Sequence, residues 1–217
     1  MNLIDAVHSK YIFSRRVSVL SRAVAQLIPP NSACLDVGCG DGTIDSIILG
    51  CRTDLAVRGI DVLVRPETRI PVVGFDGRTI PFPDNHFDVV IFVDVLHHTG
   101  LQRELLAEAA RVSRKYVVIK DHLLDGFAAE PILRYMDRRG NERFGVRSTY
   151  NYLSKNQWNS MFSELGLQVE SWVPHLGLYV WPLSCLFDRS LHFLVRLKKA
   201  QMQTDGNSVH TAGVGEA

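Results

Sequence analysis

Leu35-Asp36-Val37-Gly38-Cys39-Gly40-Asp41-Gly42 is the stretch that decides the fold of this chain. An apolar run over 33–37 leads into the glycines, and a helical pattern resumes at Thr43. Glycines between a strand and a helix permit positive φ angles and let a ligand approach the backbone N–H groups at the helix start. The stretch therefore predicts a binding turn between a buried strand and a helix.

Further apolar runs after this turn predict a sheet. Strands are expected at 33–37, 55–60, 70–73, 87–93, 116–119, 167–173 and 191–197, and helices at 3–28, 43–49, 102–112 and 155–165. Continuous apolar strands alternating with helices are typical of parallel sheets covered on both faces. We expect an α/β fold with a doubly wound, mostly parallel seven-stranded sheet and helices on both faces.

The length of 217 residues suits one domain. We expect a single domain over 1–200, with an N-terminal helical cap at 1–30 and a disordered tail at 201–217. The segment 122–154 is rich in aromatic and arginine residues. It is interpreted either as a lid over a substrate or as an ordinary solvated helix.

Composition excludes several classes of protein. A hydrophobic fraction of 46% argues against a disordered chain, and a net charge of +1 gives no general attraction to nucleic acid. No stretch looks like a membrane span or an export signal. Cys34, Cys39, Cys51 and Cys185 form no CxxC or Cys/His pattern, so we expect no metal site, reduced thiols and a cytoplasmic location.

The glycine turn differs from that of nicotinamide dehydrogenases. A dinucleotide loop reads GxGxxG/A, whereas Thr43 stands at the third small position and the glycines run G-x-G-x-G. Asp36 and Asp41 add negative charge that suits a cationic ligand better than a pyrophosphate. Asp61 ends the second strand, where its carboxylate can accept hydrogen bonds from ribose hydroxyls; the alternative is a tight turn with Asp61 as a helix cap.

Three segments together carry a family resemblance. LDVGCGDG (35–42), GID (59–61) and DGRTIPFPDNHFDVVIFVDVLHHT (76–99) resemble class I S-adenosylmethionine-dependent methyltransferases. They look most like the broad group that includes the ubiquinone and menaquinone biosynthesis methyltransferases. The PFPDNHFD run (81–88) is the most specific piece, and the motifs say more about cofactor and fold than about substrate.

The resemblance implies S-adenosylmethionine as the cofactor and a set of residues that contact it. The glycine turn would hold the methionine part, Asp61 the ribose, and the residues after the fourth strand would lie near the sulphonium. The implied residues are Asp36, Gly38, Cys39, Gly40, Gly42, Asp61, Val62, Asp76, Gly77, Asp94 and Val95. Only about ten residues separate Asp61 from Val72, so the helix expected between those strands is reduced.

Candidate catalytic residues follow the fourth and fifth strands: His97, His98, Asp121 and His122. A histidine has a suitable pKa to take a proton from a phenol or enol acceptor, and the alternative for each is a structural role. Because His97 and His98 are adjacent, we expect their side chains to point in different directions.

We expect a small-molecule acceptor and no nucleic-acid partner, because the chain lacks the N/D-P-P-Y/F run of enzymes that methylate exocyclic or amide nitrogens. The alternatives are a methyltransferase acting on RNA or protein and a non-catalytic cofactor-binding protein. Two interpretations remain for Trp172, Leu178, Tyr179 and Trp181: weak membrane contact, or covering of the sheet. The acceptor, the methylated atom and the oligomeric state do not follow from the sequence.

Overall fold

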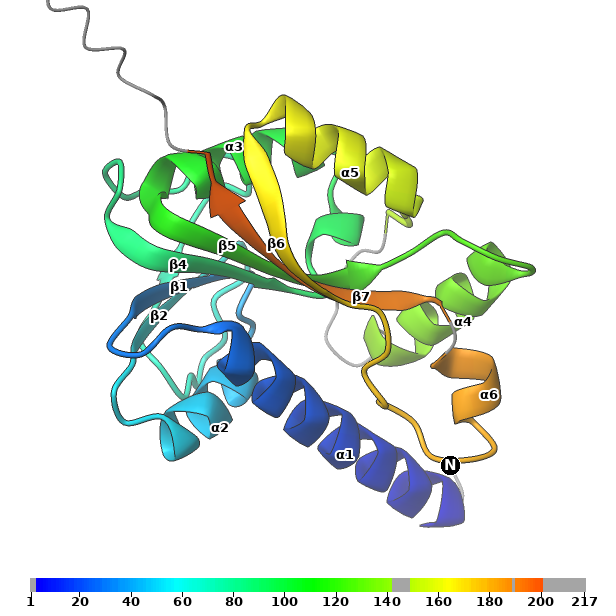
Figure 1. Ribbon diagram of the computed structural model, residues 1–217. Helices are drawn as coiled ribbons and strands as arrows, with labels where there is room; N and C mark the ends of the chain where they lie inside the picture. Colours follow the sequence, from blue (N-terminus) through cyan, green and yellow to red (C-terminus); the bar gives the residue numbers. More distant parts are fainter. Residues whose placement is uncertain (1–2, 142–148, 189, 201–217) are drawn as a thin grey trace, which may run out of the picture.

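A computed structural model describes residues 3–141, 149–188 and 190–200 (Figure 1). The elements follow the chain as α1 (Leu3–Leu27), β1 (Ala33–Val37), α2 (Thr43–Cys51), β2 (Ala56–Asp61), β3 (Val72–Gly74), β4 (Phe87–Val93), the 3₁₀ turn η1 (Leu96–His98), α3 (Gln102–Val112), β5 (Ser113–His122), α4 (Ala129–Asn141), α5 (Lys155–Glu164), β6 (Leu167–Val173), α6 (Ser184–Phe187) and β7 (His192–Lys199).

All seven strands belong to one sheet, in the order β3-β2-β1-β4-β5-β7-β6. The pairs among β1 to β5 are parallel, and β7 is antiparallel to both β5 and β6. This confirms the predicted mostly parallel, seven-stranded α/β sheet. The register sets Val37 beside Ile60 and Val93 beside Lys120, so the residues that follow these strands meet at one edge.

Helices cover both faces of the sheet, with α1 and α2 on one side and α3 and α5 on the other (Figure 1). Val24 and Ile48 pack with the inner side chains of β1 and β4 on the first face. Leu106 and Trp158 pack on the opposite face, and both are fully buried. Apolar side chains on both faces explain why the central strands read as continuous hydrophobic runs.

β5 and β3 differ most from their predicted bounds, whereas β2 and β7 differ by one or two residues at an end. β5 begins at Ser113 and ends at His122, because charged residues at its ends are held by partners that an apolar pattern does not reveal. Arg114 and Lys115, for example, both lie near the carboxylate of Asp88. β3 is only Val72–Gly74, and residues 62–71, all of them described, contain no helix, as the short spacing predicted.

The carboxyl ends of the parallel strands lie at the edge that α4, α6 and the first part of α1 surround (Figure 1). The single domain over 1–200 and the lid over 122–154 stay predictions, and residues 142–148 and the predicted tail at 201–217 lie outside the described residues. Among the described helices, none has the length and apolar character needed to cross a membrane.

Candidate functional site

The glycine turn connects β1 to α2, contacts the end of β2 and leaves space above its backbone. Gly38 has φ 78° and donates its N–H to the carbonyl of Ile60 at 2.7 Å. A Cβ at Gly38 would lie 2.6 Å from Val95, whereas a Cβ at Gly40 (φ 60°) would meet no described atom within 4 Å. Positive φ and the contact with Val95 both require glycine at position 38.

Asp61 holds this turn through its carboxylate. One oxygen accepts the N–H of Gly40 at 2.8 Å, and the other accepts the N–H of Leu63 at 2.8 Å. The alternative of a helix cap is wrong, because no helix begins in the described segment that follows. Each carboxylate oxygen can accept further hydrogen bonds, so Asp61 remains able to bind a ribose.

Asp36 lies under the glycine turn with only 3% of its surface exposed. Among the described residues, its Oδ1 atom has no hydrogen-bond partner. Burial, reinforced by the neighbouring Asp45, raises the pKa of Asp36 well above its usual range. The pair therefore favours a shared proton, and Asp36 carries less negative charge than the sequence suggested. Asp45, in the first turn of α2, was not identified from the sequence.

The expected adenine contacts also come together at this edge. Val62 is 66% exposed, and its Cγ1 lies 3.1 Å from the position of a Cβ built on Gly77. Asp76 shapes the adjoining turn, since its Oδ1 accepts the N–H groups of Arg78 and Thr79 at 2.8 and 2.7 Å. Val62 and Gly77 thus border one open apolar surface.

Asp94 follows β4 and is held by two cations. Its Oδ2 lies 2.5 Å from Nη2 of Arg16, and its Oδ1 pairs with the fully buried Nζ of Lys120. Burial acts to raise the pKa of Asp94, but Lys120 and then Arg16 outweigh it and hold the pKa well below its usual range. The charge of Asp94 is therefore already balanced by the protein.

His97 lies between two carboxylates. Its Nδ1 is 2.6 Å from Asp121 Oδ1, and its Nε2 is 3.3 Å from Asp137 Oδ2. Asp121 also accepts the N–H of Leu96 at 3.0 Å, and Tyr152 donates its hydroxyl to Asp137 Oδ2 at 2.5 Å. Burial acts to lower the pKa of His97, but Asp121 and Asp137 together raise it to about 10.

The expectation that His97 and His98 point apart is wrong. Their ring centroids are 3.9 Å apart, and each offers a nitrogen within 4.8 Å of a carboxylate oxygen of Asp137. Both residues belong to the 3₁₀ turn η1, where successive side chains are about 120° apart instead of alternating as in a strand. The two imidazoles therefore border the same space.

His122, the fourth predicted catalytic residue, joins this cluster from the end of β5. Its Nδ1 lies 3.0 Å from Nδ1 of His192, at the start of β7. Burial and the charge of Lys120 lower the pKa of both imidazoles, so both favour the neutral form. The structure thus brings all four predicted catalytic residues together.

Sequence reasoning missed half of this polar cluster. The additional members are Arg16, Lys120, Asp137, Tyr152 and His192. They come from α1, β5, α4, the segment before α5 and β7, so no local motif connects them. The run Lys120-Asp121-His122 at the end of a buried strand was the one available signal, and it was followed only for Asp121 and His122.

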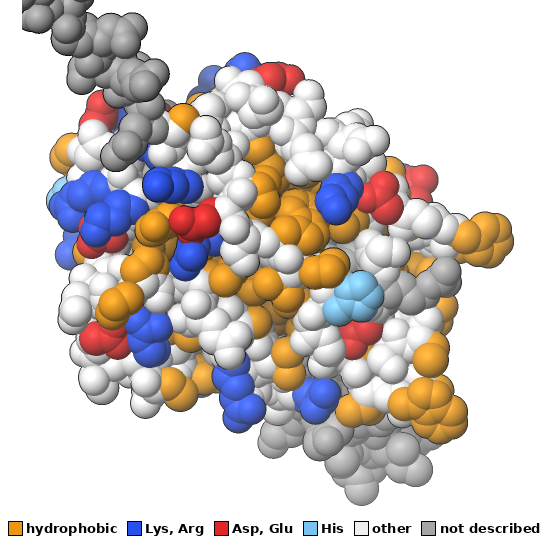
Figure 2. Space-filling model, in the orientation of Figure 1, with side chains coloured by type: hydrophobic (Ala, Val, Ile, Leu, Met, Phe, Trp, Pro, Cys, Tyr) orange, Lys and Arg blue, Asp and Glu red, His pale blue; other side chains and the backbone are white. Residues whose placement is uncertain are grey.

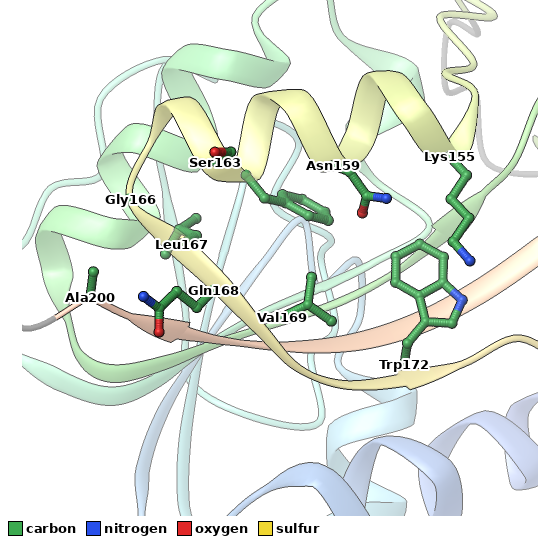
Figure 3. Close-up of a pocket in the computed structure, with 10 residues that line it drawn as sticks. Lys155, Asn159, Ser163, Gly166, Leu167, Gln168, Val169, Trp172 and Ala200 are labelled. Atoms are coloured by element: carbon green, nitrogen blue, oxygen red, sulfur yellow. The ribbon is translucent and has the colours of Figure 1, made fainter.

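A cavity of about 610 Å³ lies elsewhere, between α5 and the edge strand β6 (Figure 3). Phe162, Val169 and Trp172 line it, with Lys155 Nζ 5.0 Å from the centre of the Trp172 ring. Figure 2 shows hydrophobic side chains gathered where these two elements meet. The cavity contains none of the predicted site residues, so it is separate from the site at the strand ends.

The residues considered for membrane contact divide into two groups. Leu178 is fully buried and Trp172 stacks on Phe193 with ring centroids 4.7 Å apart, so these two help cover the sheet. Trp181 is 80% exposed. Membrane contact therefore finds no support at Leu178.

Comparisons with known proteins match this chain to methyltransferases. A family model described as a methyltransferase domain matches residues 10–171. The chain is 30% identical over 93 residues to 27-O-demethylrifamycin SV methyltransferase of Amycolatopsis mediterranei, which covers 37% of this chain and 34% of the relative. It is 28% identical over 127 residues to a tRNA (carboxymethyluridine(34)-5-O)-methyltransferase of Schizosaccharomyces pombe, covering 57% and 53%.

These matches span only about a third to a half of the length of the curated relatives. Among solved structures, a geranyl diphosphate methyltransferase in complex with S-adenosylmethionine superposes with a TM-score of 0.63 at 12% identity, covering 84% of this chain and 85% of that one. At that identity the likeness supports the fold. The family match, which covers most of the chain, shows that it belongs to the class I S-adenosylmethionine-dependent methyltransferases.

Proposed function

We propose that this methyltransferase acts on a small-molecule acceptor bound beside the buried polar cluster of Asp94, His97, Lys120, His122 and Asp137. The observation that carries the proposal is the burial of this cluster, whose histidines His97 and His122 are only 1% and 2% exposed. A polar site enclosed by α1 and α4 suits a compact acceptor better than a long polymer.

The residues at the strand ends fit the cofactor. The unpartnered Oδ1 of Asp36 suits the ammonium of its methionine part, the space above Gly40 admits its backbone, and Asp61 retains acceptors for the ribose. Val62 and Gly77 offer an apolar surface for the adenine. S-adenosylmethionine supplies an activated methyl group bound to a positively charged sulphur.

The polar cluster has a positioning function in this proposal. Asp121 is fully buried and accepts hydrogen bonds from Leu96 N–H and the His97 ring, so it acts through His97 and not on the acceptor itself. His97 and His98 border the acceptor from the η1 turn. Holding the acceptor in line with the methyl group and excluding water are the main contributions such a site makes.

The cofactor assignment is tested by calorimetry with S-adenosylmethionine on Asp61→Asn. The asparagine keeps an acceptor for Gly40 N–H but loses the second carboxylate oxygen, so we expect at least tenfold weaker binding. Glu104→Gln, an exposed change on α3, is the matched control and should bind as the native chain does. Equal affinity in both variants would remove the ribose assignment.

The acceptor class is tested by transfer of radiolabelled methyl groups into a cell extract. We expect label in the fraction of small metabolites. The tRNA methyltransferase among the relatives makes RNA the second candidate. Label confined to RNA or protein would overturn the small-molecule proposal, and cofactor binding without any transfer would favour a non-catalytic role.

A further inference from the structure

We propose that His97, His98 and Asp137 form a binding site for one divalent transition-metal ion, with Zn²⁺ as the probe. Two imidazole nitrogens and a carboxylate oxygen converge within 4.8 Å of one another. Two histidines and one carboxylate are a ligand set that zinc and iron(II) accept in enzymes, with open positions left for a substrate atom.

The spacing of the ligand atoms is close to what a shared ion requires. Bonds of about 2.1 Å to a tetrahedral ion place neighbouring ligand atoms about 3.4 Å apart. His97 Nε2 and Asp137 Oδ2 already lie 3.3 Å apart. The ring nitrogen of His98 would have to move closer to these two atoms to share the ion. Its side chain is only partly buried, which leaves room for that movement.

A second observation points to a ligand at His97. Its Nε2 is buried and, among the described residues, forms no hydrogen bond of good geometry; it contacts Asp137 Oδ2 at 3.3 Å as an ion pair. A buried imidazole nitrogen without a hydrogen bond is costly unless something else binds it. The chain provides no better-placed partner for this atom within its described part.

The surrounding contacts resemble those that support metal ligands. His97 bonds through its other nitrogen to Asp121 at 2.6 Å, which would fix the ring with Nε2 available. Tyr152 donates to the Asp137 oxygen at 2.5 Å and so orients the carboxylate. Metal-binding histidines and carboxylates are usually held by such outer partners.

The nearby charges sum to −1 when the histidines are neutral. Lys120 and Arg16 share the single carboxylate of Asp94, which leaves one positive charge. Asp121 and Asp137 contribute two negative charges, and Asp137 is itself one of the three ligand residues. An ion bound at His97 Nε2 displaces any proton there. The sequence suggested no metal site because Asp137 lies about forty residues after the histidines, outside any ligand-spacing motif.

The test is a calorimetric Zn²⁺ titration of the full chain, free of affinity tags and stripped with a chelator. We expect one ion per chain with a dissociation constant in the micromolar range or tighter. His98→Ala and Asp137→Asn should each weaken binding at least tenfold, and cobalt absorption spectra should change in both. His175→Ala, an exposed histidine outside the cluster, should bind as the native chain does.

S-adenosylmethionine binding to each variant checks that it is folded. If zinc binds the native chain no more tightly than it binds the folded His98→Ala and Asp137→Asn variants, the metal site is refuted. Any part for the ion in holding an acceptor oxygen rests on the proposed function. The titration needs no acceptor, so its failure would leave the methyl-transfer proposal intact.

Discussion

Replacing Gly38 with alanine tests whether the contact between the glycine turn and Val95 is as close as the structure places it. The change adds a Cβ 2.6 Å from Val95 at a residue with φ 78°. Positive φ costs an alanine about 1–2 kcal/mol, and the overpacking adds about 1–3 kcal/mol. Gly40→Ala meets only the first cost, because its Cβ would enter open space.

Urea denaturation of both variants measures the difference directly. We expect Gly38→Ala to lose about 1–3 kcal/mol more free energy of unfolding than Gly40→Ala. Adding Val95→Ala to Gly38→Ala should recover most of that excess, as a double-mutant cycle would show. Equal destabilisation of the two glycine variants, or no recovery with Val95→Ala, would refute the inferred contact.

Three further outcomes follow from the buried polar groups. Because burial raises the pKa of Asp45 from 3.8 to about 6, the native chain should lose roughly 3 kcal/mol of stability as pH rises from about 4 to about 6. Asp45→Asn should flatten that profile in urea denaturation between pH 4 and 7; an unchanged slope would argue against the shared proton. Lys120→Met removes one of the two cations on Asp94 and should cost about 1.5–3 kcal/mol, because Arg16 still pairs with the carboxylate; an unchanged free energy of unfolding would argue against the Lys120–Asp94 pair. Tyr152→Phe removes the hydrogen bond to Asp137 and should cost about 1.5–3 kcal/mol in the same assay, whereas a neutral effect would mean that water replaces the bond.

The central sheet could be predicted because its information is local. Phe87–Val93 is apolar throughout, which is what a strand buried on both faces requires, and the glycine turn marks its own place between β1 and α2. The ends of β5 escaped prediction because Ser113 to Lys115 and Lys120 to His122 are polar and depend on partners from other strands.

The site residues also fall into two groups, those that a local sequence pattern reveals and those that it does not. Asp61 ends a strand and Gly38 and Val95 come just after strands, in a familiar spacing, and the structure brings them to one edge. Asp137 and His192 carry no such signal, since each reaches the cluster from a distant element. The direction of His98 depended on a 3₁₀ turn that a two-residue motif does not disclose.

The reversed direction of β7 has a consequence for how such proteins diverge. Because β7 runs against β5, its first residue, His192, stands opposite His122 at the edge where the parallel strands end and not at the far end of the sheet. The connection between β6 and β7 therefore reaches the same edge as the glycine turn, but at the other end of the strand order. If the acceptor binds where we propose, changes in this connection would alter acceptor choice while the proposed nucleoside contacts at β1 and β2 stay the same.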